Sequence, residues 1–300
     1  MFHRFIFACA VVALASPALA QQRPLQTEDP ETIGAGRVLL EAGFDYDRDV
    51  PYAVSGLEGH VLTVPQFGIS VGVSSIAEIQ VDAGLYQRLS ITRRNPKAPL
   101  AGMLTIGPSD TTSSVDDANI GAKIRFLSET ARRPSMAFRF STRLPNAGNE
   151  AGLGTDTQDF GTWIAVGKTI QSVRVVTNVG LLIMANPIAQ AAQDDLLSYN
   201  LSVARAISPR AEVVGEFVGR ANFGNIQTPG AEDRGLLRFG TRYTVQGVRV
   251  DGGILLAVLS KCLCSVAIEA GLGKAQFVRS MGYTFDTVKQ GLDETPDVTH

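Results

Sequence analysis

The side chains that most often carry catalysis are scarce in this chain of 300 residues. After residue 20 only His60 and His300 remain as imidazole bases, and a serine hydrolase needs such a base beside its nucleophile. An activity of that kind would rest on His60 alone, and no nucleophile motif accompanies it. The Gly-x-Gly pieces at 152–154 and 271–273 have no predicted helix after them, so they do not indicate a phosphate-binding loop. We therefore expect no catalytic residues, no cofactor and no enzyme activity.

The cysteines and the acidic pairs do not predict a metal centre. Cys262 and Cys264 lie two positions apart, so on an extended strand their side chains point the same way without facing each other. No histidine lies near them to complete a zinc site. We interpret these thiols as incidental, with a disulfide or metal capture as the alternatives. The acidic pairs at 116–117, 194–195 and 232–233 are interpreted as solvated turn residues, with divalent cations bound against lipopolysaccharide as the alternative.

Charged side chains instead recur at every second position within apolar segments. Between residues 117 and 127, Phe126 belongs to an apolar set of even positions and Arg125 to a charged set of odd ones. The segments 135–144 and 234–245 repeat this split, which is the period of a β-strand with two different faces. The polar faces supply the candidate lining of an interior: Glu41, Asp82, Arg125, Arg139, Arg143, Trp163, Glu212, Glu216, Arg234, Arg238 and Arg242.

The alternation predicts an all-β protein. Each candidate strand is long enough for the roughly 9–11 tilted residues that cross a hydrocarbon layer. We expect about twelve strands, at 37–47, 60–73, 78–89, 117–127, 135–144, 159–169, 172–184, 196–206, 210–222, 234–245, 247–258 and 274–285.

The connections between these strands alternate strictly between short and long. The short ones fall near 74–76, 128–133, 170–171, 207–209 and 246, and the long ones near 48–59, 90–116, 145–158, 185–195, 223–233 and 259–273. A soluble sandwich has no need of this rule, whereas an up-and-down membrane barrel with tight periplasmic turns and long outer loops follows it. In lipid, β-strands can span only as a closed barrel that leaves no backbone group unpaired. We therefore predict an antiparallel transmembrane β-barrel, apolar outside and ionic inside.

The two ends of the chain predict export and assembly. Residues 1–20 have a basic start, an apolar centre and a small-x-small end, as in a secretory signal peptide. We expect residues 21–32 to form a short periplasmic segment, 33–285 the barrel, and 286–300 a polar tail. Gly282, Tyr283 and Phe285 resemble the terminal signal that the barrel-assembly machinery reads in outer-membrane proteins, although here a tail follows it. A plain hydrophobic strand end is the alternative.

Four short pieces resemble a bacterial outer-membrane family labelled "meta-pathway of phenol degradation" or "transporter". The resemblance spans roughly residues 30–285, and its motifs lie at 116–127, 137–146, 152–160 and 178–180. It implies an outer-membrane β-barrel that passes or binds small, often apolar or aromatic, compounds. The label does not supply the substrate.

Composition and family together lead to a transport hypothesis. A formal charge of −2 gives no electrostatic reason to expect a nucleic-acid partner, and 45% hydrophobic content argues against disorder. We expect a monomer in the cell outer membrane, in contact with lipid, that forms a passage for small molecules. Opposite charges across a bore of this size could line the passage or close it. The alternatives are a non-conducting structural or adhesive barrel and an exported soluble lipid-binding β protein.

Overall fold

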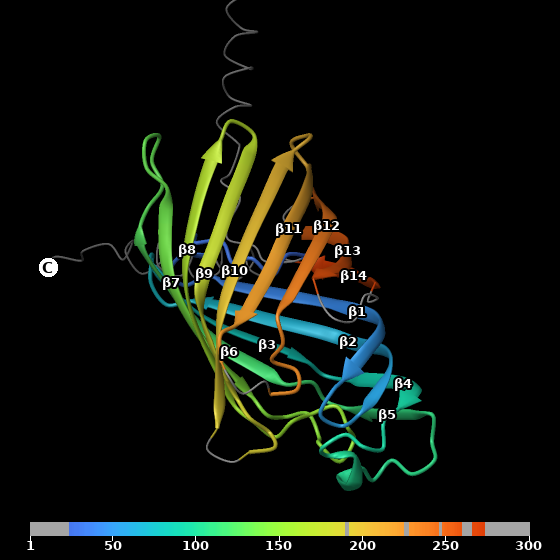
Figure 1. Ribbon diagram of the computed structural model, residues 1–300. Helices are drawn as coiled ribbons and strands as arrows, with labels where there is room; N and C mark the ends of the chain where they lie inside the picture. The colour runs from blue at the N-terminus through green and yellow to red at the C-terminus, as the bar shows by residue number, and fades with distance from the viewer. Residues whose placement is uncertain (1–23, 190–191, 225–227, 246–247, 260–265, 274–300) are drawn as a thin grey trace, which may run out of the picture.

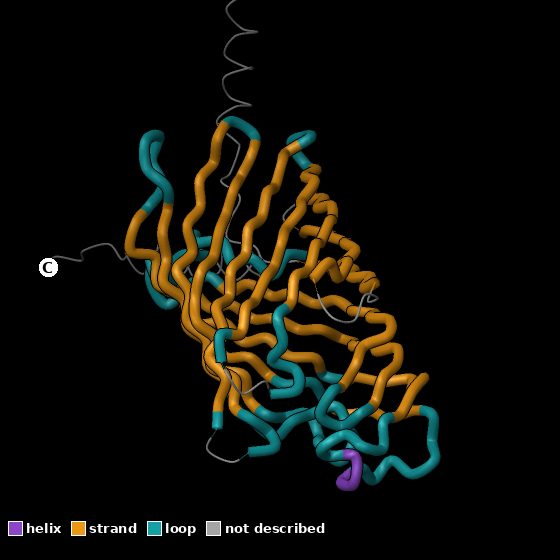
Figure 2. Tube along the Cα trace, viewed as in Figure 1, coloured by secondary structure: helices purple, strands orange, loops and turns teal. Residues whose placement is uncertain are grey.

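The computed structural model describes residues 24–189, 192–224, 228–245, 248–259 and 266–273. A single antiparallel sheet dominates this part of the chain (Figures 1 and 2). The signal peptide, the assembly signal at Gly282, Tyr283 and Phe285, the tail 286–300 and the two cysteines Cys262 and Cys264 lie outside the described residues. No helix in the described ranges is long and apolar enough to cross a membrane.

The strands follow one another as neighbours around a ring. β1 pairs with β2 on one side and with β14 on the other, which closes the sheet on itself. A single turn of 3-10 helix, η1 (Ala101–Met103), lies in the loop between β4 and β5. The strands are β1 (Val38–Tyr52), β2 (Leu57–Gly72), β3 (Ala77–Gly84), β4 (Gln87–Arg94), β5 (Thr111–Ser114), β6 (Ala118–Leu127), β7 (Ser135–Leu144), β8 (Asp159–Ile170), β9 (Val173–Ala185), β10 (Gln193–Ala206), β11 (Ala211–Asn222), β12 (Arg234–Val245), β13 (Val248–Leu259) and β14 (Val266–Gly273).

Two of the spans are interrupted, so the fourteen strands make twelve spans of the wall. β3 and β4 both pair with β2, one beyond the other, while β6 pairs with β3 and β5 with β4. The break on β2 falls at Pro65, which has no amide hydrogen to donate to a neighbouring strand. The expected twelve-span, up-and-down antiparallel barrel is confirmed.

The sequence placed the ends of several strands wrongly. The strand expected at 78–89 is divided between β3 and β4, and the loop expected near 90–116 contains the end of β4 and all of β5. The loop expected near 48–59 is only the turn 53–56, because β1 and β2 both extend into it. A register shift between Asp47 and Val50 changes which face each residue takes, and such a bulge interrupts the period of two. The loop expected at 259–273 contains β14, the strand that closes the ring on β1. The strand expected at 274–285 lies outside the described residues.

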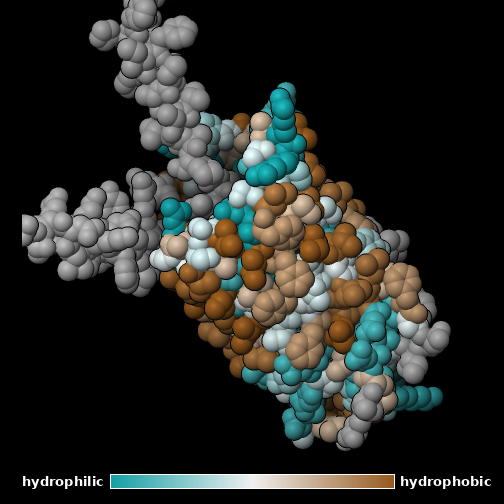
Figure 3. Space-filling view, turned by 90° about the vertical axis from the view of Figure 1, so that its left-hand side faces the viewer, coloured by the Kyte–Doolittle hydropathy of each residue, from teal (hydrophilic) through white to brown (hydrophobic). Residues whose placement is uncertain are grey.

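The two faces of β6, β7 and β12 are sorted as the alternation predicted, whereas in β4 Leu89 is buried and Arg88 is exposed, the reverse of the expected pattern. On the outer face Phe126 is 56% exposed and Phe239 is 48% exposed, whereas Arg238 on the inner face is 4% exposed. Apolar surface covers the middle of the wall, with hydrophilic residues at its ends (Figure 3). A water-soluble β protein has the reverse arrangement, so the exterior is that of a barrel in lipid.

Residues 24–36 precede β1, and residues 24–33 of this segment lie inside the ring. The main-chain amide of Gln26 donates to the Glu216 carboxylate on β11, and that of Ile33 donates to Glu78 on β3. These two strands belong to different parts of the wall, so the segment crosses the interior. The sequence predicts that residues 21–32 lie in the periplasm. The structure differs, because the described residues 24–32 occupy the lumen.

Candidate functional site: the barrel interior

The N-terminal segment is held inside the barrel by acidic side chains that meet basic ones on the wall. Asp29 forms an ion pair with Arg174 on β9 at 2.8 Å, and Glu31 pairs with Arg125 on β6. Both contacts lie near the short turns, since Arg125 also donates to the carbonyl oxygen of Ser75 in the β2–β3 turn. The segment therefore obstructs the short-turn end of the lumen.

Deeper in the lumen, one lysine joins the segment to two strands. The Lys123 ammonium lies 2.8 Å from Glu28 and 2.9 Å from Glu78, and its side chain is 1% exposed. Burial opposes ionisation of Glu28, but Lys123 and Arg139 outweigh it and lower the pKa of this carboxyl to about 2. An ion cluster of this kind fixes position, because removing one member leaves the others charged and buried.

Further hydrogen bonds complete the attachment. Asn178 on β9 accepts from the Glu28 amide at 2.7 Å and donates to its carbonyl oxygen at 2.8 Å, as a neighbouring strand would. Glu216 accepts from both the amide and the hydroxyl of Thr27. Arg238 donates to the Pro24 carbonyl oxygen at 2.9 Å and to Glu216 at 3.0 Å. The wall thus supplies hydrogen-bond partners to main-chain groups of Pro24, Thr27 and Glu28 and to the Thr27 hydroxyl.

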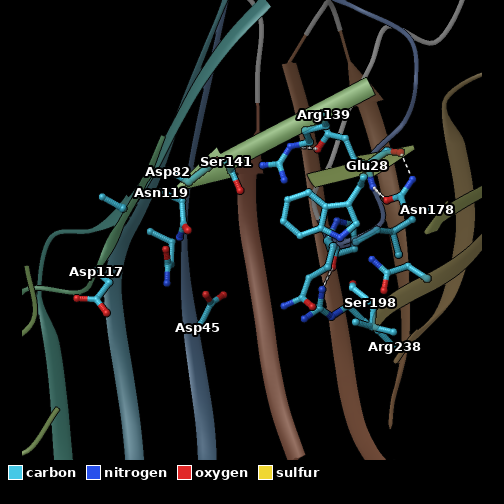
Figure 4. A pocket seen from close by; sticks show the side chains of 18 of the residues that line it. Glu28, Asp45, Asp82, Asp117, Asn119, Arg139, Ser141, Asn178, Ser198 and Arg238 are labelled. Atoms are coloured by element: carbon cyan, nitrogen blue, oxygen red, sulfur yellow. Dashed lines mark hydrogen bonds and ion pairs between the residues drawn. The ribbon is translucent and has the colours of Figure 1, made fainter. Parts of the chain in front are cut away.

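Beside residues 24–28 the interior remains open. A cavity of about 490 Å³ borders this segment and extends to Asp117, near the long-loop end of β6 (Figure 4). A second cavity of about 320 Å³ shares Gln26, Asp45 and Arg238 with the first and extends along β11 and β12. Together they form one polar region, which we call the chamber.

The only tryptophan of the chain lies in the chamber wall. The Trp163 ring is packed against backbone, since a Cβ atom on Gly161 would lie 1.9 Å from it and one on Gly180 would lie 2.6 Å from it. The Arg139 guanidinium carbon lies 5.4 Å from the centre of the ring, in a cation–π contact. The two glycines therefore let the indole lie flat on the wall beside a cation, and its inward orientation is as predicted.

The structure brings most of the predicted lining residues into two groups. Arg139, Trp163, Asp82, Arg234 and Arg238 border the chamber. Other candidates lie inside the barrel in ion pairs: Arg125 with Glu31, Arg143 with Asp117 and Asp159, Glu216 with Arg238, and Glu212 with Arg242. Glu41 is also buried on the inner face of β1.

The long-loop end of the barrel is covered on one side by apolar residues. Leu57, Val61 and Leu89 on the inner faces of β2 and β4 pack with Leu153 from the β7–β8 loop. The loop is also tied down by main-chain groups, since the Ser55 hydroxyl donates to the Gly152 carbonyl oxygen at 2.8 Å. This loop, 145–158, therefore folds over the mouth instead of extending into solvent.

The N-terminal residues are what sequence reasoning missed. Glu28, Asp29 and Glu31 lie outside any alternating segment, and each finds its partner far along the chain. A usable signal was present, because a short acidic run precedes a barrel whose predicted interior is rich in arginine. The charge pattern predicts closure of the interior only by side chains of the strands. In the structure, residues that precede the first strand also obstruct the lumen.

The remaining catalytic and metal candidates do not assemble into a centre within the described residues. The His60 ring accepts a hydrogen bond from the Asp49 amide at 3.3 Å and lies 6.3 Å from the ring of Tyr46. No group of three histidine, cysteine or acidic side chains there could hold a metal ion. Of the acidic pairs, Asp194 accepts hydrogen bonds from Thr228 and Asn222, and so connects β10 to the following loop.

Comparison with solved structures supports the fold. The chain is similar to the NanC porin, with a TM-score of 0.52 and 7% identity over 79% of this chain and 99% of that one. It is also similar to an outer membrane channel from Pseudomonas putida F1, with a TM-score of 0.56 and 11% identity over 82% and 98% of the two chains. No protein-family model and no curated protein sequence matches the chain. The structure thus has the fold of a twelve-stranded outer-membrane β-barrel.

Proposed function

We propose that this protein resides in the cell outer membrane and forms a restricted passage for small molecules. The observation that carries the proposal is the chamber, an open polar space of about 490 Å³ inside a wall whose outer face is apolar. If the charged side chains of the strands served only to stiffen the barrel, we would expect them to fill this space. In this proposal the apolar exterior contacts outer-membrane lipid, and the barrel-assembly machinery inserts the chain after export.

The topology gives the passage a direction. Short turns belong on the periplasmic side and long loops outside, so the chamber opens toward the outer loops and residues 24–33 narrow the periplasmic half. The fold comparisons support a channel, since two proteins described as a porin and an outer membrane channel share it. The segments 116–127 and 137–146 resemble a family whose members are taken to pass or bind small, often apolar or aromatic, compounds, and we include such compounds among the solutes to test. We propose transport and not catalysis.

A non-conducting barrel is the second candidate. It is favoured by the cluster of Glu28, Lys123 and Glu78, which fastens the N-terminal segment across the lumen. The two candidates differ in one measurable property. A passage lets solute through at some rate, whereas a closed structural or adhesive barrel does not.

The test is single-channel recording in planar bilayers, together with swelling of liposomes in a panel of aromatic and polar solutes. We expect small openings for the natural protein and larger ones for Glu28→Gln, which weakens the attachment of the segment. Glu58→Gln is the matched control, because Glu58 pairs with Arg93 near the long-loop end and makes no contact with residues 24–33 in the structure. If neither the natural protein nor Glu28→Gln conducts or permits swelling, the passage is refuted and the structural barrel is favoured.

A further inference from the structure

The charges that border the chamber are separated onto opposite sides of it. The carboxylates of Asp45 and Asp82 come from β1 and β3, and that of Asp117 directly precedes β6, all on the first half of the ring. Asp117 is paired on that side with Arg143. The guanidinium groups of Arg139 and Arg238 come from β7 and β12 on the second half. Figure 4 shows Asp45, Asp82 and Asp117 on one side of the open space and Arg139 and Arg238 on the other.

The second cavity extends the same separation. Asp47 on β1 joins the acidic side, while Arg220 and Arg234 on β11 and β12 join the basic side. Arg220 donates to the carbonyl oxygens of Glu232 and Gly230, which are uncharged acceptors. The basic side also contains two acids, since Glu28 lies 3.8 Å from Arg139 and Glu216 lies 3.0 Å from Arg238. Arg220 and Arg234 add two more guanidinium groups to that side, and Glu232 lies near both of them.

Opposite charges on the two sides of a narrow space favour binding of a solute that carries both a positive and a negative group. A solute with one charge is attracted to one side and repelled by the other, so its net gain is small. A solute with an ammonium at one end and a carboxylate at the other gains on both sides, provided that it is oriented along the separation. Trp163 adds a flat apolar surface to the lining of the chamber. An apolar or aromatic body can pack there.

We propose that the chamber is a binding site for small zwitterions in which an ammonium and a carboxylate flank an apolar or aromatic body. The ammonium faces Asp45 and Asp82, the carboxylate faces Arg139 and Arg238, and the body lies against Trp163. The inference rests on the proposed function, because it names the solute class that the passage takes. Its test reports binding and passage separately.

Trp163 provides the binding readout, because it is the only tryptophan in the sequence. The full-length protein is titrated in detergent with 4-(aminomethyl)benzoate, a zwitterion, while its tryptophan emission is recorded. The matched solutes are benzylamine, benzoate and benzyl alcohol, which carry the cation, the anion or neither. We expect a saturable change with the zwitterion at about tenfold lower concentration than with any of the other three.

Two variants test which side of the chamber binds the ammonium and which side binds the carboxylate of the ligand. Asp82→Asn should weaken binding of the zwitterion and of benzylamine while leaving benzoate unchanged or stronger. Arg238→Gln should weaken binding of the zwitterion and of benzoate but not of benzylamine. Asp195→Asn, at an exposed position near the outer end of β10, is the control and should change none of the four titrations.

The outcomes separate the two proposals. Equal responses to all four solutes, or no response to any, would overturn the zwitterion site. Selective binding of the zwitterion without liposome swelling would retain the site and refute the passage. Swelling that is equally fast with all four solutes, without selective emission changes, would retain the passage and refute the site.

Discussion

At the scale of single residues, Lys123 shows how a charge can be kept inside a membrane barrel. Its ammonium contacts Glu28 and Glu78 and also donates to the Asp29 carbonyl oxygen at 2.9 Å. The odd positions of 117–127 predicted that this side chain points inward. Its partner Glu28 could not be predicted, because no local period links the N-terminal segment to β6.

Replacing Lys123 by methionine tests this cluster. The change preserves the length of the side chain but leaves the Glu28 and Glu78 carboxylates buried without their cation, so we expect a loss of about 3–5 kcal/mol in the free energy of unfolding. Urea unfolding in lipid vesicles, followed by Trp163 emission, measures it. Lys168→Met is the control, since that side chain is about a quarter exposed at the short-turn rim. A loss no larger than that of the control would contradict the structural role of Lys123.

The pKa of Glu28 predicts how the segment responds to acid. Its folded pKa is about 2 against an ordinary value of 4.5, so its ionised form stabilises the attachment above about pH 4.5. That stabilisation is lost as the pH falls from about 4.5 toward 2. We expect single-channel conductance to rise reversibly in this interval. Glu28→Gln should show a flatter pH profile, and an identical profile for both proteins would exclude Glu28 as the responsible group.

At the scale of elements, the β7–β8 loop is held over the mouth by a close approach that only glycine permits. Gly152 has φ +77°, and a Cβ atom there would lie 2.5 Å from Leu57 Cδ1. The sequence marked 145–158 as a long, glycine-rich outer loop. It did not indicate that the loop folds inward, because this depends on the apolar contact of Leu153 with β2 and β4.

Gly152→Ala therefore should release the loop. Alanine is strained at positive φ and meets Leu57, which together cost roughly 1–3 kcal/mol locally. We expect faster proteolytic cleavage within 145–158 and a higher rate of solute entry. Gly102→Ala is the matched control in the β4–β5 loop, because a Cβ atom there meets nothing within 4 Å. If both variants are cleaved at the same rate as the natural protein, the loop is not held by this contact.

At the scale of the whole molecule, the apolar exterior determines where the protein can fold. Phe138 on β7 is 38% exposed on the outer wall, whereas Phe223 in the β11–β12 loop is 75% exposed. The wall residue should face lipid, and the loop residue should face water or headgroups. The two phenylalanines therefore provide a matched pair.

Phe138→Arg should impair folding into lipid vesicles, at a cost of up to about 2–4 kcal/mol if the residue lies near the bilayer centre. Phe223→Arg should change the free energy of folding by less than about 1 kcal/mol. Heat-modifiable migration in detergent gels reports the folded fraction of each. If the two variants fold equally well, Phe138 does not face the lipid interior.

The sequence by itself determined the barrel, because the alternation of apolar and charged residues is local and is repeated in every span. It could not place the ends of β1 and β2, where a bulge interrupts the period, or recognise β14 in a glycine-containing segment. Only the tertiary structure decided that residues 24–33 enter the lumen and that charges separate across the chamber. Both depend on contacts between residues far apart in the chain, for which no local pattern exists.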